Sequence, residues 1–332
     1  MVEKNGDIID CVDIYKQPAF DHPLLKNHNL QRRPTILPKP TKQMYRKKLR
    51  SRSEVESCPY GSVPLRRLQK KDLLRGKTLL NQRHPTFGSL ASLSSGMHYA
   101  RALTPIDDPE QQFFGAKITI TARLYWGVSV YNLTGDGIEA LQITQSMLWI
   151  GTAAHGAYNS LEYGWTVNPK LYGDSKPRTY SVWTTDLQDT GCYNAICPGY
   201  VQVSHKRIMG EINKPLSVFG ETVYAMEFYI FRDPNTSNWW LIENLGNVKN
   251  EPVGYWPKEL FPTLKDYAKV VQLGGKVYNP SSIPKNTPMG NGAFVEDFTR
   301  TCYASNIEFV DSNFKFYFGI TKRQRQITKR RR

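Results

Sequence analysis

The stretch from Asn159 to Pro169 has the residue types and spacing best suited to chemistry, because it carries a single carboxylate, Glu162, with a glycine two positions later. Read with the period of two that a strand imposes, Glu162 and Gly164 fall on a polar face, and the alternate residues fall on an apolar face. The glycine leaves the polar face open to the close approach of another backbone. A glutamate on such a face is usually only solvated. The pattern predicts a half-buried strand with Glu162 as a candidate acid or base on its wet side.

Two other stretches are also candidates for a functional site, Gln145–Trp149 and Gln272–Val277. The second places Lys276 on its polar face. A concave surface that combined Glu162 and Lys276 with aromatic rings would hold an extended peptide or a glycan, because aromatic rings pack well on proline and on sugars. The aromatic residues that we expect to bind substrate on this surface are Tyr163, Trp165, Trp183 and Tyr193.

Four of the five cysteines suggest two disulfides. Cys192 and Cys197 are separated by four residues, which suits a small closed loop, whereas a zinc site would need further ligands and the nearby sequence has no second pair of Cys or His. Cys11 and Cys58 would pair in an oxidising compartment and hold the tight turn that follows Cys58. Cys302 is left over, and we expect it to be buried and unreactive.

Other catalytic chemistries have little support in the sequence. It contains no Gly-Xaa-Ser-Xaa-Gly elbow, no His-Glu-Xaa-Xaa-His pair, no phosphate-binding loop and no dinucleotide fingerprint. We therefore expect no metal ion and no cofactor. His98, His155 and His205 are scattered along the chain, which is typical of structural or surface histidines rather than of a catalytic base.

Short runs of aromatic and β-branched residues, separated by Gly, Pro, Asn and Asp, predict an all-β fold, either a sandwich or a barrel. Strand-like alternation begins near Phe113, with Lys117 and Thr119 on the face expected to meet water. Only Lys258–Val271 shows helical spacing. The segments expected to form strands are Lys117–Trp126, Gln142–Ile150, Asn159–Val167, Thr179–Thr184, Tyr200–Ser204, Val223–Phe231, Trp239–Leu245, Val270–Tyr278 and Phe314–Ile320.

Residues 1–100 contrast with this pattern, because they are rich in proline and charge and poor in alternation, which predicts an extended arm such as a pro-segment or lid. The net charge of the chain is +15, but much of the excess lies in basic runs of this region and in the tail after Thr321. Such runs usually only keep a chain solvated, so we do not expect a nucleic-acid partner, whose signature would be a steep salt dependence. No run of about 18 apolar residues occurs, so the sequence predicts no membrane span.

The signals for cellular location conflict. Charged residues follow Met1 at once, so no apolar signal segment is visible, and this by itself indicates the cytosol. The cysteines and two glycosylation sequons, at Asn132 and Asn235, indicate the secretory pathway instead. We expect a secreted protein, extracellular or vacuolar, whose signal peptide is not part of this sequence.

Several longer motifs occur in a definite order along the chain. They are Asp10–Pro23, Cys58–Pro64, Glu162–Val167, Leu171–Asp174, Thr190–Cys197, Gly254–Pro257 and Leu260–Phe261. With these motifs the chain resembles, over nearly its whole length, the plant neprosin family of glutamic prolyl endopeptidases. The resemblance implies two packed antiparallel sheets, secretion, an N-terminal segment removed on activation, and hydrolysis at proline in acid. It divides the chain into a pro-segment at 1–100, a peptidase domain at 103–318 and a basic tail at 319–332.

The resemblance also implies a catalytic site of two facing glutamates, helped by a glutamine. Two close carboxylates share one proton and can work as an acid and base pair. Glu162 stands at the first glutamate position, but Lys276 stands at the second and Met147 at the glutamine position. A lysine would favour the ionised form of Glu162 and lower its pKa, and the loss of an amide donor typically slows a reaction by about 10²-fold.

These departures lead to the hypothesis that the cleft persists in a catalytically degenerate form, with an ion pair between Glu162 and Lys276. One alternative is that another acid, for instance Glu243 or Glu251, replaces the missing glutamate in an active peptidase. The family reaction implies proline-containing peptides or proteins as partners. A further alternative is a non-catalytic secreted module that binds proline-rich peptide or cell-wall glycan in the retained cleft.

Overall fold

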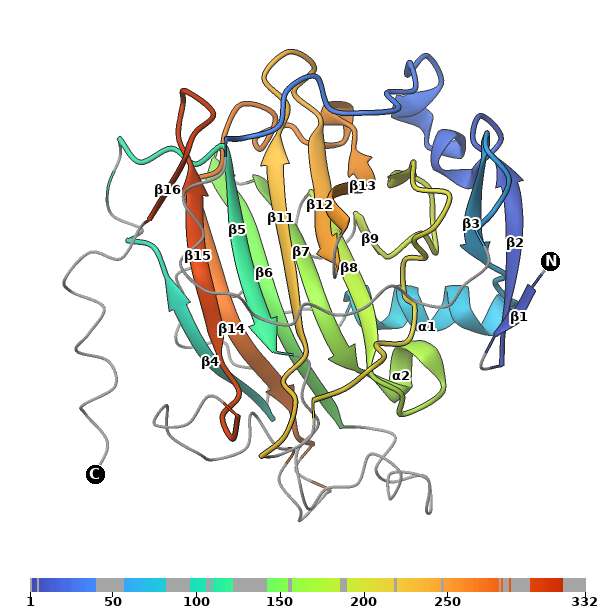
Figure 1. Ribbon diagram of the computed structural model, residues 1–332. Helices are drawn as coiled ribbons and strands as arrows, with labels where there is room; N and C mark the ends of the chain where they lie inside the picture. The colour runs from blue at the N-terminus through green and yellow to red at the C-terminus, as the bar shows by residue number, and fades with distance from the viewer. Residues whose placement is uncertain are drawn as a thin grey trace.

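The computed structural model shows two antiparallel sheets packed face to face (Figure 1). It describes residues 2–4, 6–39, 57–81, 96–105, 108, 110–121, 142–154, 157–185, 190–217, 220–245, 248–280, 282, 287 and 299–318. The first sheet has seven strands, in the order β10 (Val201–Gln202), β13 (Val248–Trp256), β12 (Trp239–Leu245), β11 (Ala225–Arg232), β5 (Gly115–Thr121), β15 (Ala304–Val310) and β16 (Phe316–Phe318). The second has six, in the order β4 (Met97–Leu103), β14 (Val270–Tyr278), β6 (Ile143–Ala154), β7 (Ala157–Val167), β8 (Arg178–Thr184) and β9 (Gly191–Tyr193). The prediction of an all-β, two-sheet antiparallel sandwich is confirmed.

The core lies between the two sheets, because each inner face carries the apolar residues of the alternation. Ile118 and Phe228 of the seven-stranded sheet are fully buried, as are Ile150 and Tyr163 of the six-stranded sheet. The Tyr163 ring packs edge-on against the Phe228 ring, with 4.8 Å between their centroids. This contact shows which face of β7 points inward.

The outer face of the seven-stranded sheet is buried where the sequence predicted water. Lys117 and Thr119 are only 8% and 0% exposed. The Lys117 ammonium lies 3.7 Å from Glu227 and 3.8 Å from Glu308, and the Thr119 hydroxyl donates to Glu227. The prediction of a wet face was wrong because polar side chains on this face pair with one another instead of with solvent.

The N-terminal segment is more structured than the predicted irregular arm. β1 (Val2–Lys4), β2 (Asp7–Asp13) and β3 (Ser62–Arg66) form a small antiparallel sheet beside the sandwich (Figure 1). Two short 3-10 helices follow β2, η1 (Pro18–Asp21) and η2 (Pro23–Leu25). Ala19 and Phe20 pack in the same apolar cluster as Trp240 and Tyr255 on the outer face of the seven-stranded sheet. The segment therefore folds onto the sandwich.

The helix α1 (Lys70–Asn81) was also not predicted. The Asp72 carboxylate accepts a hydrogen bond from the Gln69 amide at 2.9 Å and so satisfies one free donor at the start of the helix. Leu79 and Leu80 are buried, but the other leucines of α1 are exposed. Its apolar residues thus do not form the single stripe by which an amphipathic helix is recognised. Contacts with β9 and with the short helix α2 (Pro169–Tyr172) position it.

The predicted helix at Lys258–Val271 is wrong. Only a short 3-10 turn, η5 (Lys258–Leu260), forms there, and β14 begins at Val270. Pro262 is the physical reason, because proline has no amide hydrogen and disfavours helical backbone in the preceding residue. That residue, Phe261, has the extended angles φ −119° and ψ 103°.

Most predicted strands are present, some with the predicted ends and some with shifted ends. The predictions at Asn159–Val167, Thr179–Thr184, Trp239–Leu245 and Val270–Tyr278 correspond to β7, β8, β12 and β14. The strands β4, β9, β13 and β15 were not predicted. The segment Arg123–Trp126, Asn132, His155 and the tail at 319–332 lie outside the described residues.

Candidate active site

Three neighbouring strands, β14, β6 and β7, bring the candidate catalytic residues together. Antiparallel partners share a face of the sheet. Glu162 on β7 lies opposite Trp149 on β6, and Lys276 on β14 lies opposite Gln145 on β6. Because Trp149 and Gln145 are four residues apart, Glu162 and Lys276 share one face, with Met147 midway between them.

Glycines flank Met147 on both sides of this face. Met147 pairs with Gly164 on β7 and with Gly274 on β14. A Cβ atom on Gly164 would lie 2.0 Å from the carbonyl oxygen of Ser146, so no larger residue fits without movement of the backbone. Along this row, therefore, the two positions beside Met147 carry no side chain.

Glu162 and Lys276 form a buried ion pair. The Lys276 ammonium lies 3.0 Å from Oε1 and 3.4 Å from Oε2 of Glu162. The Tyr180 hydroxyl on β8 donates to the same Oε1. Glu162 is 1% exposed and Lys276 is 8% exposed. The polar face expected to meet solvent is therefore covered, and its acid has donors from two other strands.

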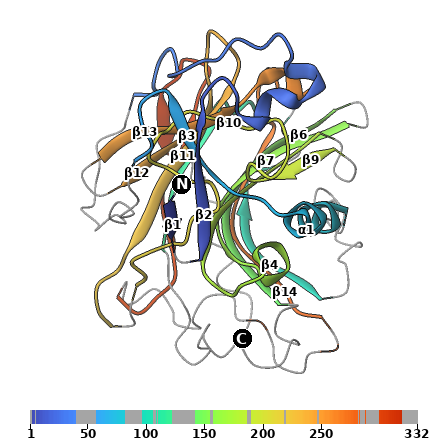
Figure 2. The same ribbon diagram turned by 90° about the vertical axis from the view of Figure 1, so that its right-hand side faces the viewer.

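The N-terminal segment supplies part of the cover. Figure 2 shows α1 on the side of the six-stranded sheet that faces away from the seven-stranded sheet. Leu79 and Leu80 of α1 belong to the same buried apolar cluster as Met147, Tyr180 and Val182. These three residues lie on the face that carries Glu162. The helix contacts β9, the edge strand of this sheet.

Three of the four aromatic residues expected beside Glu162 lie on the opposite face. The Tyr163 hydroxyl donates to Glu243 of the seven-stranded sheet, and the Trp165 indole donates to the Thr121 carbonyl at 3.0 Å. Trp183 pairs in register with Leu161, the inward neighbour of Glu162. The expectation that Tyr163, Trp165 and Trp183 line a surface with Glu162 was wrong. The period of two points Tyr163 and Trp165 of β7 into the core, and Trp183 of β8 shares the face of its partner Leu161.

Tyr193 and Tyr180 are the aromatic residues that share the Glu162 face. Tyr193 lies opposite Val182, which lies opposite Glu162, and it is 6% exposed. Tyr180 lies opposite Gly164 and reaches the carboxylate. Sequence reasoning missed Tyr180, although its strand was predicted, because alternation within β8 gives no register against β7.

Glu243 is held elsewhere and does not reach Lys276 or Glu162. It lies on the inner side of the seven-stranded sheet, where Arg207 donates to its Oε2 at 2.7 Å from Nε and approaches at 2.6 Å from Nη2. Burial alone would lower the pKa of Arg207, but Glu211 and Glu243 outweigh burial and raise it. The backbone of the six-stranded sheet separates this network from Glu162.

Glu251, the other acid considered as a replacement, lies opposite Glu243 on the neighbouring strand. Its carboxylate accepts a hydrogen bond from the Ser204 hydroxyl at 3.1 Å. Ser204 follows β10, an edge strand of the seven-stranded sheet, whereas β7 and β14 belong to the other sheet. Neither acid stands beside Glu162 in this structure.

Both expected disulfides are present, Cys11–Cys58 and Cys192–Cys197. Cys302 is not in a disulfide, and it is half-buried rather than buried as expected. Asn235 is exposed in a turn, where an attached glycan would meet solvent.

Two family models match the chain. The model described as Neprosin matches residues 140–331 and contains Met147, Glu162, Tyr180 and Lys276. The model described as Neprosin activation peptide matches residues 2–100 and contains β1 to β3 and α1. In the part of the chain that the structure describes, no helix has both the length and the apolar character needed to cross a membrane.

Proposed function

Because the chain belongs to the neprosin family, we propose that it retains the cleft of a glutamic prolyl endopeptidase in a catalytically degenerate form. The family reaction is hydrolysis at proline, which makes proline-containing peptides the partners, and we propose no role for nucleic acid. Glu162 occupies the position of one catalytic glutamate. The observation that carries the proposal is the 3.0 Å contact between its Oε1 and the Lys276 ammonium.

This contact opposes the acid and base chemistry that the family reaction needs. Two facing carboxylates hold one proton between them, so one activates water while the other donates. An ammonium group instead stabilises the ionised form of Glu162 and leaves no second carboxyl to share a proton. Lys276 contacts both oxygens of the Glu162 carboxylate and Tyr180 donates to Oε1, so these donors compete with a water molecule for the base. Met147 has no N–H group to stabilise an oxyanion.

The test is cleavage of a quenched proline-containing peptide from about pH 2.5 to about pH 7, after removal of the N-terminal segment. We expect no cleavage by the natural chain and acid-dependent cleavage by Lys276→Glu. Adding Met147→Gln to that change should raise the rate by about 10²-fold. Lys258→Glu, at an exposed position of η5, is the charge-matched control and should stay inactive.

Cleavage by the natural chain that disappears in Glu162→Gln would contradict the proposal, because Glu162 would then work beside Lys276. Cleavage that persists in Glu162→Gln but disappears in Glu243→Gln or Glu251→Gln would assign the reaction to a different acid.

A second candidate function is binding without cleavage, of proline-rich peptide or of cell-wall glycan, in a secreted module. It is favoured by the side chains on the Glu162 face, where Tyr180, Tyr193 and Trp149 accompany the ion pair. Calorimetry with a proline-rich peptide and a neutral glycan would detect it. Tyr193→Ala should weaken the binding, because it removes an aromatic surface.

The family and the two disulfides indicate the secretory pathway. We propose an extracellular or vacuolar destination, with glycans at Asn132 and Asn235. The proposed division is a pro-segment at 1–100, a peptidase domain at 103–318 and a basic tail at 319–332. A mass decrease after deglycosylation that is lost in Asn235→Gln would support a glycan at that position.

A further inference from the structure

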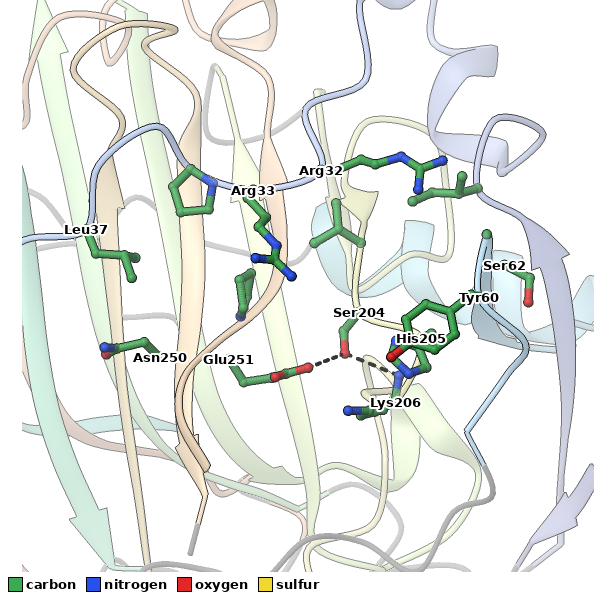
Figure 3. Close-up of a pocket in the computed structure, with 15 residues that line it drawn as sticks. Arg32, Arg33, Leu37, Tyr60, Ser62, Ser204, His205, Lys206, Asn250 and Glu251 are labelled. Carbon is green, nitrogen blue, oxygen red and sulfur yellow. Dashed lines mark hydrogen bonds between the residues drawn. The ribbon is translucent and has the colours of Figure 1, made fainter. Parts of the chain in front are cut away.

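A pocket of about 520 Å³ lies where the N-terminal segment meets the seven-stranded sheet (Figure 3). One wall comes from the range matched by the activation peptide and includes Arg33 and Tyr60. The other wall comes from the loop after β10 and from β13, and includes Lys206 and Glu251. Glu162 and Lys276 do not line it, so it is separate from the candidate active site.

The lining is basic, and two of its cations have no partner among the described residues. Arg32, Arg33 and Lys206 line the pocket, whereas Glu251 is the one carboxylate among the lining residues that the structure describes. Arg32 donates to the Tyr15 hydroxyl at 3.3 Å. Within the part of the chain that the structure describes, the side chains of Arg33 and Lys206 have no hydrogen bond or ion pair. Unpaired cations around a concave surface attract an anion, and a guanidinium group binds a planar carboxylate through two hydrogen bonds.

The remaining lining suits a sugar rather than a phosphate. Tyr60 is 90% exposed, and its ring lies against His205 with 4.6 Å between centroids, so the ring is supported on one side. Aromatic rings held in this way pack against the apolar faces of sugars. Glu251 and Ser204, joined by a 3.1 Å hydrogen bond, offer a carboxylate and a hydroxyl to sugar hydroxyl groups. Because Glu251 would repel any anion close to it, this side of the pocket favours a ligand whose hydroxyl groups lie here and whose negative charge lies on the side of Arg33 and Lys206.

We propose that this pocket binds a short oligosaccharide of uronic acids. Its carboxylates lie on Arg33 and Lys206, a sugar ring lies on Tyr60, and its hydroxyls bond to Glu251 and Ser204. Because the walls come from both parts of the chain, the bound sugar also holds the N-terminal segment against the sheet. The proposal does not depend on whether the cleft at Glu162 is active.

The test is calorimetric titration of the full chain with a galacturonate trimer and with the methyl ester of the same trimer. We expect the acid to bind and the ester to bind at least about tenfold more weakly, because esterification removes the charge. Arg33→Gln and Lys206→Gln should each lower the affinity for the galacturonate trimer by about tenfold. Tyr60→Ala should lower the affinity for both the trimer and its methyl ester. These side chains are exposed or unpaired, so equal melting temperatures will show that the variants fold.

The matched control is Lys71→Gln with Lys77→Gln, which removes two exposed charges from α1. This double variant should bind the trimer as the natural chain does. Amide hydrogen exchange places the ligand, because binding at the pocket should slow exchange in both β3 and β13. The proposal would be overturned if the trimer did not bind or if the ester bound with equal affinity. It would also be overturned if the α1 control lost as much affinity for the trimer as the pocket variants. Equally tight binding of a single-stranded oligonucleotide, unaffected by Arg33→Gln, would also overturn it and assign the basic charge to nucleic acid.

Discussion

The charge on Glu162 is held by side chains from two other strands. The Lys276 ammonium from β14 contacts both carboxylate oxygens, and the Tyr180 hydroxyl from β8 donates to one of them. Because both charged residues are almost fully buried, neither can exchange its partner for water. The pair is therefore a structural unit as well as the reason to expect lost catalysis.

Removing one partner of this pair should be costly. We predict that Lys276→Met lowers the free energy of unfolding by about 3–5 kcal/mol at neutral pH, because it leaves a buried carboxylate without its ammonium partner. Adding Glu162→Gln should recover much of the loss, because the buried charge is then gone. Denaturant unfolding of the full chain measures both effects, with Lys77→Met at an exposed position of α1 as the control. Additive losses in the double variant would refute the coupling.

At the scale of elements, the close pairing of β7 with β6 and of β14 with β4 depends on the two glycines beside Met147. Gly274 has φ +141°, a backbone conformation that favours glycine, and a Cβ atom there would lie 2.2 Å from the Ala100 carbonyl oxygen. A Cβ atom on Gly164 would meet the backbone of β6. Neither contact can be relieved by turning a side chain, so the strands would have to separate.

Two glycine substitutions should therefore have opposite effects. We predict that Gly164→Ala lowers the free energy of unfolding by about 1–3 kcal/mol, because it overpacks the strand pair. Gly76→Ala in α1 should raise it by about 0.5–1 kcal/mol, because alanine favours helix and its Cβ would lie 3.5 Å from Ile196, an ordinary contact. Thermal and denaturant unfolding of the full chain measure both changes. A stabilising Gly164→Ala would show that β6 and β7 pair less closely than described.

At the scale of the whole molecule, the N-terminal segment forms polar contacts with both sheets. Arg178 of β8 reaches Asp7 of β2 at 2.6 Å. The Gln17 side chain and the Gln202 backbone on β10 exchange hydrogen bonds of 3.0 and 2.8 Å. Together with α1 over the six-stranded sheet (Figure 2), these contacts make the segment part of the fold rather than an appended arm.

Two titrating groups at this junction should make its stability depend on pH. Burial lowers the pKa of His28 below its ordinary value of 6.5, although Glu259, 3.3 Å away, acts in the opposite direction. Burial alone would raise the pKa of Asp233, but hydrogen bonds from Thr35 and nearby backbone amides hold it below the ordinary 3.8. Both groups bind protons less readily in the folded chain than in the unfolded chain. Their contribution is therefore present at neutral pH and is lost in acid.

We predict that the melting temperature of the full chain falls as the pH drops below about 6.5 and falls further below about 3.8. His28→Gln should reduce the first fall, and Asp233→Asn should reduce the second. His98→Gln, at an exposed position of β4, is the control and should leave the profile unchanged. Calorimetry from neutral to acidic pH measures the profile. A profile of His28→Gln identical to that of the natural chain would remove His28 from the explanation.

The sequence by itself determined features that depend on neighbouring residues or on a long ordered set of motifs. Alternation around Glu162 and Lys276 placed both residues on strands, and the spacing of Cys192 and Cys197 predicted their disulfide. The motifs also identified the family that the matches at residues 2–100 and 140–331 establish. Local backbone geometry and local chain closure carry this information, so no distant contact is needed to recover it.

Only the tertiary structure decided the register of the strands and what covers each face. The period of two divides Tyr163 from Glu162, but inward and outward are set by packing against the other sheet, where Tyr163 meets Phe228. The hydrogen bond from Tyr180 to Glu162 and the ion pair of Lys117 with Glu227 both connect residues far apart in sequence. The placement of α1 over the six-stranded sheet arises in the same way. Such contacts depend on how distant segments of the chain pack together, so they cannot be predicted from the residues of one strand alone.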